Sequence, residues 1–210
     1  MSAADDTTTR LEVAHVLFMD LVGYSRLAVE EQSRRIAALQ DIVRGTAAYT
    51  QAKHEASVLA HPAGDGMALA FFGDPSSPAR CALEVAEAAR GRADLPLRMG
   101  IHSGPIHRAE DINDTPNVRG PGINLAQRVM DCGDAGHILL SYMTAEALIE
   151  SEVWKARLHD LGEVEVKHGV RIRIYSLAID GAAEPQRPAK VVELAAQWAA
   201  EHRTHNLPVA

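Results

Sequence analysis

The sequence predicts an α+β fold, in which a ferredoxin-like βαββαβ core is followed by a helix–strand–helix–hairpin extension. Short apolar runs alternate along the chain with stretches whose apolar residues recur at helical spacing. Clusters of glycine, proline and polar residues separate these segments and mark turns. The length of 210 residues and the hydrophobic content of 47% suit one domain with a sizeable core and short extensions.

The core is predicted from six segments in order. In the first helix Ile36, Leu39 and Val43 share one face. In the second, Pro78 marks the first turn and Gly91 the end. The second and third strands are apolar runs separated by turn residues, which is typical of a hairpin. The predicted strands are 13–19, 56–60, 67–72 and 97–102, and the predicted helices are 26–49 and 77–91.

The extension follows a polar, turn-rich stretch, 107–121, which we expect to be a loop or arm. Its predicted elements are a helix at 123–130, a strand at 137–140, a helix at 144–149 and a hairpin of 164–166 with 172–177. We expect residues 1–11 to be disordered and 12–180 to form the folded domain. Residues 181–210 would be a linker and an amphipathic helix carrying Leu194 and Trp198.

Charge and composition exclude several classes of protein. The formal net charge of −7 argues against a partner that is nucleic acid or an anionic membrane. The polar, acidic first ten residues are no signal peptide, and no apolar run reaches the length of a membrane span. Cys81 and Cys132 do not form a disulfide framework. We therefore expect a cytoplasmic protein.

The predicted strand order brings two carboxylates together. Asp20 ends the first strand, and Asp65 lies in the hairpin just before the third. In a ferredoxin-like sheet these strands are antiparallel neighbours, so both side chains reach one edge. Paired carboxylate oxygens facing the free amides of the turn 22–25 suit two Mg²⁺ or Mn²⁺ ions and a phosphate group.

Six motifs then occur in a recognisable order. They are FMDLVGYS, AGDGMALAF, LRMGIHSG, GPGINLAQRV, GHILLS and LGEVEVKHGVRIRIYSL. Together, over about residues 13–178, they resemble the catalytic domain of the class III nucleotidyl cyclases, the adenylate and guanylate cyclase family. The resemblance identifies 12–180 as a cyclase catalytic domain with the class III fold.

The resemblance implies a role for each motif. Asp20 and Asp65 would hold two divalent cations, Mg²⁺ or Mn²⁺, with the Leu21 carbonyl as an added ligand. Arg98 would contact the triphosphate. The backbone amides that would cradle the β- and γ-phosphates belong to Val22, Gly23, Tyr24 and Ser25.

The helix motif supplies the other half of the site. Asn124 resembles the residue that orients the ribose, and Arg128 the residue that stabilises charge on the α-phosphate. They are four residues apart and share one helix face. In this family that helix comes from the opposite subunit, which implies a head-to-tail homodimer with two symmetric sites. The phosphate-binding lysine of the family's last hairpin has no clean counterpart here, with Lys167 and Arg171 as candidates.

The base-reading positions depart from the family's purine patterns. They fall on His61 and Asn117, where adenylate cyclases typically carry Lys and Asp, and guanylate cyclases Glu and a small polar residue. An imidazole and an amide can each donate and accept, which fits uracil or cytosine. Tyr49 is a candidate pocket wall.

We therefore favour a stand-alone pyrimidine cyclase resembling those of bacterial Pycsar anti-phage signalling. It would make cyclic UMP, or cyclic CMP, for a downstream effector protein. The alternatives are an adenylate cyclase with a diverged pocket and a non-catalytic nucleotide-binding domain.

Overall fold

A computed structural model describes residues 11–110, 116–180 and 187–203, and their strands form one mixed sheet of eight. The strands are β1 (Leu11–Leu21), β2 (Val58–Ala63), β3 (Gly66–Phe71), β4 (Leu97–Glu110), β5 (Pro116–Arg119), β6 (Ile138–Ser141), β7 (Leu158–Val166) and β8 (Val170–Leu177). The α-helices are α1 (Val29–Gly45), α2 (Ala47–His54), α3 (Ser77–Ala88), α4 (Pro121–Met130), α5 (Tyr142–Ile149), α6 (Glu152–Lys155) and α7 (Ala189–Arg203). Two 3₁₀ turns are η1 (Tyr24–Arg26) and η2 (Lys167–Gly169).

The strand order across the sheet is β2-β3-β1-β4-β6-β8-β7, and β5 pairs with the far end of β4. β1 lies at the centre of the core, antiparallel to both β3 and β4. β4 and β6 pair in parallel, as a crossover through α4 requires. The predicted α+β fold, with the first and third strands as antiparallel neighbours, is confirmed.

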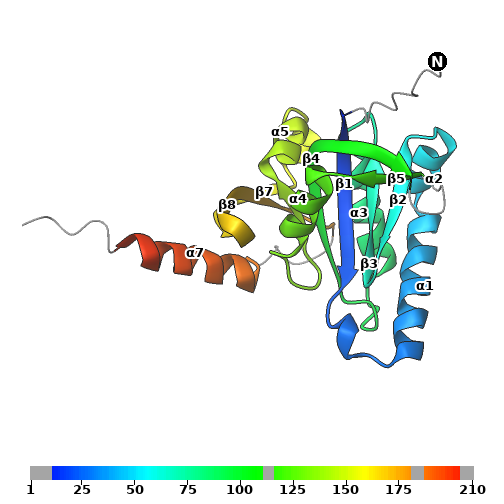
Figure 1. Cartoon of the computed structure of the whole chain (residues 1–210), viewed down its shortest axis with the longest axis horizontal. Coiled ribbons are helices and arrows are strands. Elements are labelled where there is room, and N and C mark those ends of the chain that lie inside the picture. The colour runs from blue at the N-terminus through cyan, green and yellow to red at the C-terminus, as the bar shows by residue number, and fades with distance from the viewer. Residues whose placement is uncertain (1–10, 111–115, 181–186, 204–210) are drawn as a thin grey trace, which may run out of the picture.

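Helices cover both faces of the sheet, which explains why β1 is an almost continuous apolar run. Leu17 and Met19 face the layer formed by α1, α2 and α3, whereas Val16 and Phe18 face α4. Figure 1 shows α1 and α4 on opposite sides of the central strands. The alternation of β1 between two hydrophobic cores fixes its register, because a slip of one residue would exchange the two faces.

α4 lies directly against β4. A Cβ atom on Gly100 would be 2.3 Å from the backbone nitrogen of Met130, so only glycine allows this approach. Ala126 and Met130 are fully buried or nearly so on the inner side of α4. The close contact fixes the position of the opposite, outward side of this helix.

Several boundaries differ from those predicted. The single helix 26–49 is two helices, because the Thr46 hydroxyl donates to the Val43 carbonyl at 2.8 Å and accepts from the Tyr49 amide at 3.3 Å, ending one helix and capping the next. The stretch 107–121 is partly strand, since its two ends pair as β4 and β5. The short helix α6 was not predicted.

The two ends of the chain are described only in part. Of residues 1–11, predicted to be disordered, 1–10 lie outside the described residues, and Leu11 is the first residue of β1, where it pairs with β4. Residues 181–186 of the predicted linker also lie outside the described residues. The predicted C-terminal helix is α7. Val191, 1% exposed, joins it to a third apolar cluster with residues of α4, β7 and β8. Among the helices that the structure describes, none is long and apolar enough to cross a membrane.

Candidate active site

Asp20 and Asp65 lie at the same edge of the sheet. Asp20 is paired in register with Gly66 of β3 on one side and with Arg98 of β4 on the other. Asp65 occupies the exposed turn before β3, where its carbonyl oxygen accepts a hydrogen bond of 3.2 Å from the Leu21 amide. A Cβ atom on Gly66 would lie 1.9 Å from the backbone of β1, so glycine is required beside Asp20.

Arg98 holds the Asp20 carboxylate from the neighbouring strand. Its Nε and Nη2 donate to Oδ1 and Oδ2 of Asp20, each at 2.7 Å. Nη2 also lies 3.0 Å from Oδ1 of Asp131, the residue that follows α4. The hydrogen bond to Asp20 raises the pKa of Arg98, against the effect of burial, and the charges of Asp20, Asp131 and Asp65 raise it further. Asp65 is therefore close enough to share the field of this guanidinium.

The oxygen donors at this edge fit a hard divalent cation. Mg²⁺ and Mn²⁺ prefer carboxylate and carbonyl oxygens, and Mg²⁺ usually completes its shell with phosphate oxygens and water. Each Asp20 oxygen accepts one hydrogen bond from Arg98 and retains a lone pair for a cation. Within the described ranges, no three or more His, Cys, Asp or Glu side chains are grouped so that they alone could hold a metal ion. Asp20, Asp65 and the Leu21 carbonyl therefore fit metal ions that arrive with a triphosphate.

The turn after Asp20 offers three backbone amides rather than four. The Val22 amide donates to the Pro96 carbonyl at 2.9 Å and is not available to a ligand. The first hydrogen bond of η1 runs from the Arg26 amide to the Gly23 carbonyl. The amides of Gly23, Tyr24 and Ser25 come before it in the chain and take no part in the hydrogen bonds of the 3₁₀ turn. These three N–H groups have no acceptor within the turn and could receive phosphate oxygens.

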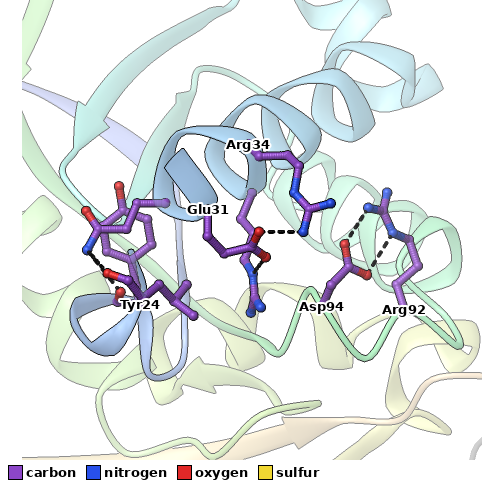
Figure 2. Close-up of polar contacts among 8 residues, drawn as sticks. Tyr24, Glu31, Arg34, Arg92 and Asp94 are labelled. Atoms are coloured by element: carbon purple, nitrogen blue, oxygen red, sulfur yellow. Dashed lines mark hydrogen bonds and ion pairs between the residues drawn. The ribbon is translucent and has the colours of Figure 1, made fainter. Parts of the chain in front are cut away.

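α1 fixes this turn from outside. The Gln32 side-chain amide donates to the carbonyls of Tyr24 at 3.3 Å and Leu27 at 3.1 Å. Figure 2 shows this contact at Tyr24 next to the ion pair of Glu31 with Arg34. The start of α1 therefore holds the turn in one conformation before any ligand binds.

Asn124 and Arg128 lie on α4, the helix that packs on β4 and β1. Asn124 is exposed and Arg128 is half-buried, on the side of the helix that does not face β4. In the described part of one chain, no hydrogen bond or ion pair joins either residue to Asp20 or Asp65. Asp131, which sequence reasoning missed, links the end of α4 to Arg98.

His61 and Asn117 lie in contact. His61 Nδ1 and Asn117 Oδ1 are 2.7 Å apart, between β2 and β5. The same Oδ1 accepts from the Val118 amide at 2.7 Å, which identifies it as the oxygen. Since an amide oxygen only accepts, Nδ1 must donate. A neutral His61 therefore presents Nε2 as an acceptor, next to the amide N–H groups of Asn117.

Tyr49 does not join this pair. It packs with Ala60 and Pro62 around a cavity of about 170 Å³ on the face covered by α1 and α2. His61 lies between Ala60 and Pro62 in β2, so its side chain points to the opposite face. The structure thus brings together two of the three predicted base-site residues.

Lys167 lies beside Arg128, whereas Arg171 does not. Lys167 and Arg128 line one recess at the end of α4. Nη2 of Arg171 is 3.4 Å from Oε2 of Glu163, and the Arg171 guanidinium lies over the ring of Trp198. Of the two candidates for the last-hairpin phosphate contact, Lys167 shares a recess with Arg128, whereas Arg171 lines a different cavity with Leu125 of α4.

The site thus combines two carboxylates at the end of β1 and the start of β3 with a helix, α4, that carries Asn124 and Arg128 on the face of the sheet. The family model for the adenylate and guanylate cyclase catalytic domain matches residues 75–179, half of the chain, and the chain belongs to this family. The match includes Arg98, Asn124 and Arg128 but ends before α7 and begins after Asp20 and Asp65. A comparison with curated proteins found no match.

Solved structures share the fold over most of the chain. The guanylate cyclase domain of RhGC from Catenaria anguillulae, in complex with GTP, is 20% identical with a TM-score of 0.66, covering 81% of this chain and 98% of that one. The adenylyl cyclase CyaB from P. aeruginosa is 19% identical with a TM-score of 0.63, covering 85% and 97%. An adenylate/guanylate cyclase/hydrolase from Silicibacter pomeroyi is 26% identical with a TM-score of 0.61, covering 81% and 99%.

Proposed function

We propose that this protein is a homodimeric nucleotidyl cyclase that converts a nucleoside triphosphate to its 3′,5′-cyclic nucleotide and pyrophosphate. The observation that carries the proposal is the position of Asp20, which lies between the Asp65–Gly66 turn and Arg98 at one sheet edge. Two carboxylates and three turn amides without an acceptor in the turn would suit a metal–triphosphate complex.

In the proposed reaction the ribose 3′-hydroxyl attacks the α-phosphorus in line, and the bond to pyrophosphate breaks. Asn124 orients the ribose, and Arg128 neutralises charge that develops on the α-phosphate, an effect worth about 10³–10⁵ in rate for arginines in other phosphoryl-transfer enzymes. Arg98 holds Asp20 and has Nη1 left to contact the triphosphate. Two divalent cations, when bound, would lower the pKa of the 3′-hydroxyl and neutralise the triphosphate.

In the described part of one chain neither Asn124 nor Arg128 contacts the two carboxylates, which supports a head-to-tail homodimer. Asp20 and Asp65 of one subunit would work with Asn124 and Arg128 of the other, which gives two equivalent sites. Each site closes only at the subunit interface, so a lone subunit would not turn over.

For the base, we propose a pyrimidine, with UTP ahead of CTP. Uracil would donate N3–H to Nε2 of His61 and accept from the Asn117 amide at a neighbouring carbonyl. Cytosine would meet the same pair with its N4 amino group and N3. Neither residue carries the carboxylate that a guanine-reading site uses.

Two observations support other functions. Adenine could also meet His61 and Asn117, through its N6 amino group and N1, so an adenylate cyclase is the second candidate. The third candidate is a domain that binds a nucleotide without cyclising it. The hydrogen bonds from Arg98 to both Asp20 oxygens favour it. A downstream effector that responds to the cyclic nucleotide in anti-phage defence belongs to the pyrimidine proposal alone, whereas a cytoplasmic location is proposed for all three functions.

Incubation of the purified protein with ATP, GTP, CTP and UTP, each with Mn²⁺, tests the proposal. Chromatography and mass spectrometry of the products should identify cyclic UMP, with less cyclic CMP. Cyclic AMP as the only product would overturn the pyrimidine assignment. Nucleotide binding without pyrophosphate release from any of the four would support the non-catalytic domain.

A further inference from the structure

A small recess lies at the C-terminal end of α4 and is built by three elements that are distant in sequence. Its volume is about 120 Å³. Arg128 comes from α4, Lys167 from the β7–β8 hairpin and Lys190 from α7. Three cationic side chains thus converge on one opening.

The first turn of α7 is held in place by its neighbours. The Ala189 amide donates to Oδ2 of Asp134 at 2.8 Å, and Val191 is 1% exposed in the third apolar cluster. Just before the helix, Arg187 donates to the Leu161 carbonyl at 2.6 Å. Lys190 lies between Ala189 and Val191, so its backbone is fixed beside the recess while its side chain stays exposed. α7 packs against β7, and Figure 1 shows it extending away from the sheet.

The charge around the recess is positive. Asp131 is the one carboxylate among its lining residues, and Arg98 already engages it at 3.0 Å. In the portions of the chain that the structure describes, Arg128, Lys167 and Lys190 form no ion pair. Burial raises the pKa of the Cys132 thiol at the recess to about 11, while the charge of Lys190 acts in the opposite direction. Lys190 and Cys132 line the recess together.

We propose that Lys190 is a third cation of the half-site on α4 and binds the polyphosphate of the substrate or the departing pyrophosphate together with Arg128 and Lys167. This inference rests on the proposed function for its substrate. α7 begins at Ala189, beyond the residues 75–179 that match the cyclase family, so this contact is an addition of this chain to the family's site. The C-terminal helix then contributes to substrate binding as well as to folding.

Binding of inorganic tripolyphosphate to the full chain, measured by isothermal titration calorimetry at fixed ionic strength with EDTA, tests the proposal without turnover. Lys190→Met removes the charge and keeps most of the aliphatic stem, and Lys190→Arg keeps the charge. Lys53→Met, an exposed lysine of α2, is the matched control, because it lowers the net charge of −7 by the same one unit. Thermal unfolding of each variant checks that the fold is intact.

We expect Lys190→Met to weaken tripolyphosphate binding by about fivefold, since an exposed charge-assisted contact is worth little more. Lys190→Arg should stay within about twofold of the wild type, because it preserves the cation. Lys53→Met should bind like the wild type. Unchanged binding by Lys190→Met would overturn the proposal, and so would an equal loss in Lys53→Met, which would indicate a general effect of net charge.

The same data separate this proposal from the proposed function. If no nucleoside triphosphate is cyclised but Lys190→Met still weakens tripolyphosphate binding, the catalytic proposal fails and the anion site stands. If a cyclic nucleotide forms but Lys190→Met binds like the wild type, the anion site fails alone. With an active protein, Lys190→Met should raise KM for the triphosphate more than it lowers kcat.

Discussion

Asp20 and Arg98 face each other across β1 and β4 and are joined by two parallel hydrogen bonds of 2.7 Å. The Asp20 side chain is 6% exposed and that of Arg98 is 22% exposed, so the pair is largely shielded from water. A two-point contact with a carboxylate fixes the plane of the guanidinium. The pair therefore sets the orientation of the carboxylate proposed to bind metal, before any metal is present.

Removal of Arg98 should destabilise the fold. Arg98→Ala would leave Asp20 buried without its partner, and we expect the free energy of unfolding to fall by about 2 kcal/mol, after allowing for the partial exposure of the pair. Urea denaturation measures this loss. Arg92 makes a similar two-point contact with Asp94 on the surface, shown in Figure 2, and is the matched control. An equal loss in Arg92→Ala would contradict the importance of burial at Asp20.

Asp65 should be needed for turnover and not for stability. Its side chain is in an exposed turn, and the hydrogen bond to Leu21 uses its backbone carbonyl, which Asp65→Ala retains. We expect the free energy of unfolding to change by less than about 0.5 kcal/mol. Formation of cyclic nucleotide should fall by at least about 10³-fold, because a metal ligand is lost. Asp41→Ala, on the exposed side of α1, removes the same charge and should remain active.

The proposed base site can be tested by restoring the adenylate cyclase pattern. His61→Lys combined with Asn117→Asp replaces the observed pair with the residues that adenylate cyclases typically carry. We expect the ratio of kcat/KM for ATP to that for UTP to rise by at least about tenfold, because the site would then match adenine and leave a uracil edge unpaired. An equal loss with both nucleotides would show that the pair does not read the base.

His102 should make the protein sensitive to acid. His102 is 6% exposed, and its Nδ1 shares a hydrogen bond of 2.8 Å with the Ser141 hydroxyl. Burial lowers the pKa of His102 to about 4. The unfolded imidazole has a pKa near its ordinary value of about 6.5, so the unfolded state binds more protons between these values. The stability contributed by the neutral imidazole is therefore complete above about pH 6.5 and is lost as the pH falls toward 4.

His102→Gln removes this titration and keeps a hydrogen-bonding group. Between pH 7.5 and 5 the wild type should lose about 2 kcal/mol more than the variant in its free energy of unfolding. Parallel pH profiles in both proteins would assign the acid sensitivity to other groups.

The strand order and the approach of Asp65 to Asp20 could be predicted because both follow from apolar periodicity and hairpin turns. The position of His61 within β2 could not. Pro62 next to it indicated a turn, but β2 is an edge strand, where proline is tolerated. The arm of β4 and β5 was also missed as strand, since its residues are mostly polar and its pairing uses the backbone.

Contacts between distant side chains were the least predictable part of the site. The Asp20–Arg98 pair depends on a register that the sequence does not state, and the link to Asp131 depends on how α4 lies on β4. Lys190 carried no sequence signal, because only the fold of α7 brings it to Arg128. Tyr49 illustrates the opposite case, a candidate wall of the base pocket that lies on the other face of the sheet.

Cross-complementation of two inactive variants tests whether the protein is a cyclase whose sites form between two subunits. Asp65→Ala and Arg128→Ala, each inactive as a homodimer, are co-expressed with different tags, and the mixed dimer is isolated by sequential affinity steps. One of its two sites would be intact, so the isolated mixed dimer should recover about half of the wild-type rate of cyclic nucleotide formation. A folded mixed dimer with no activity would show that the two half-sites do not combine across subunits.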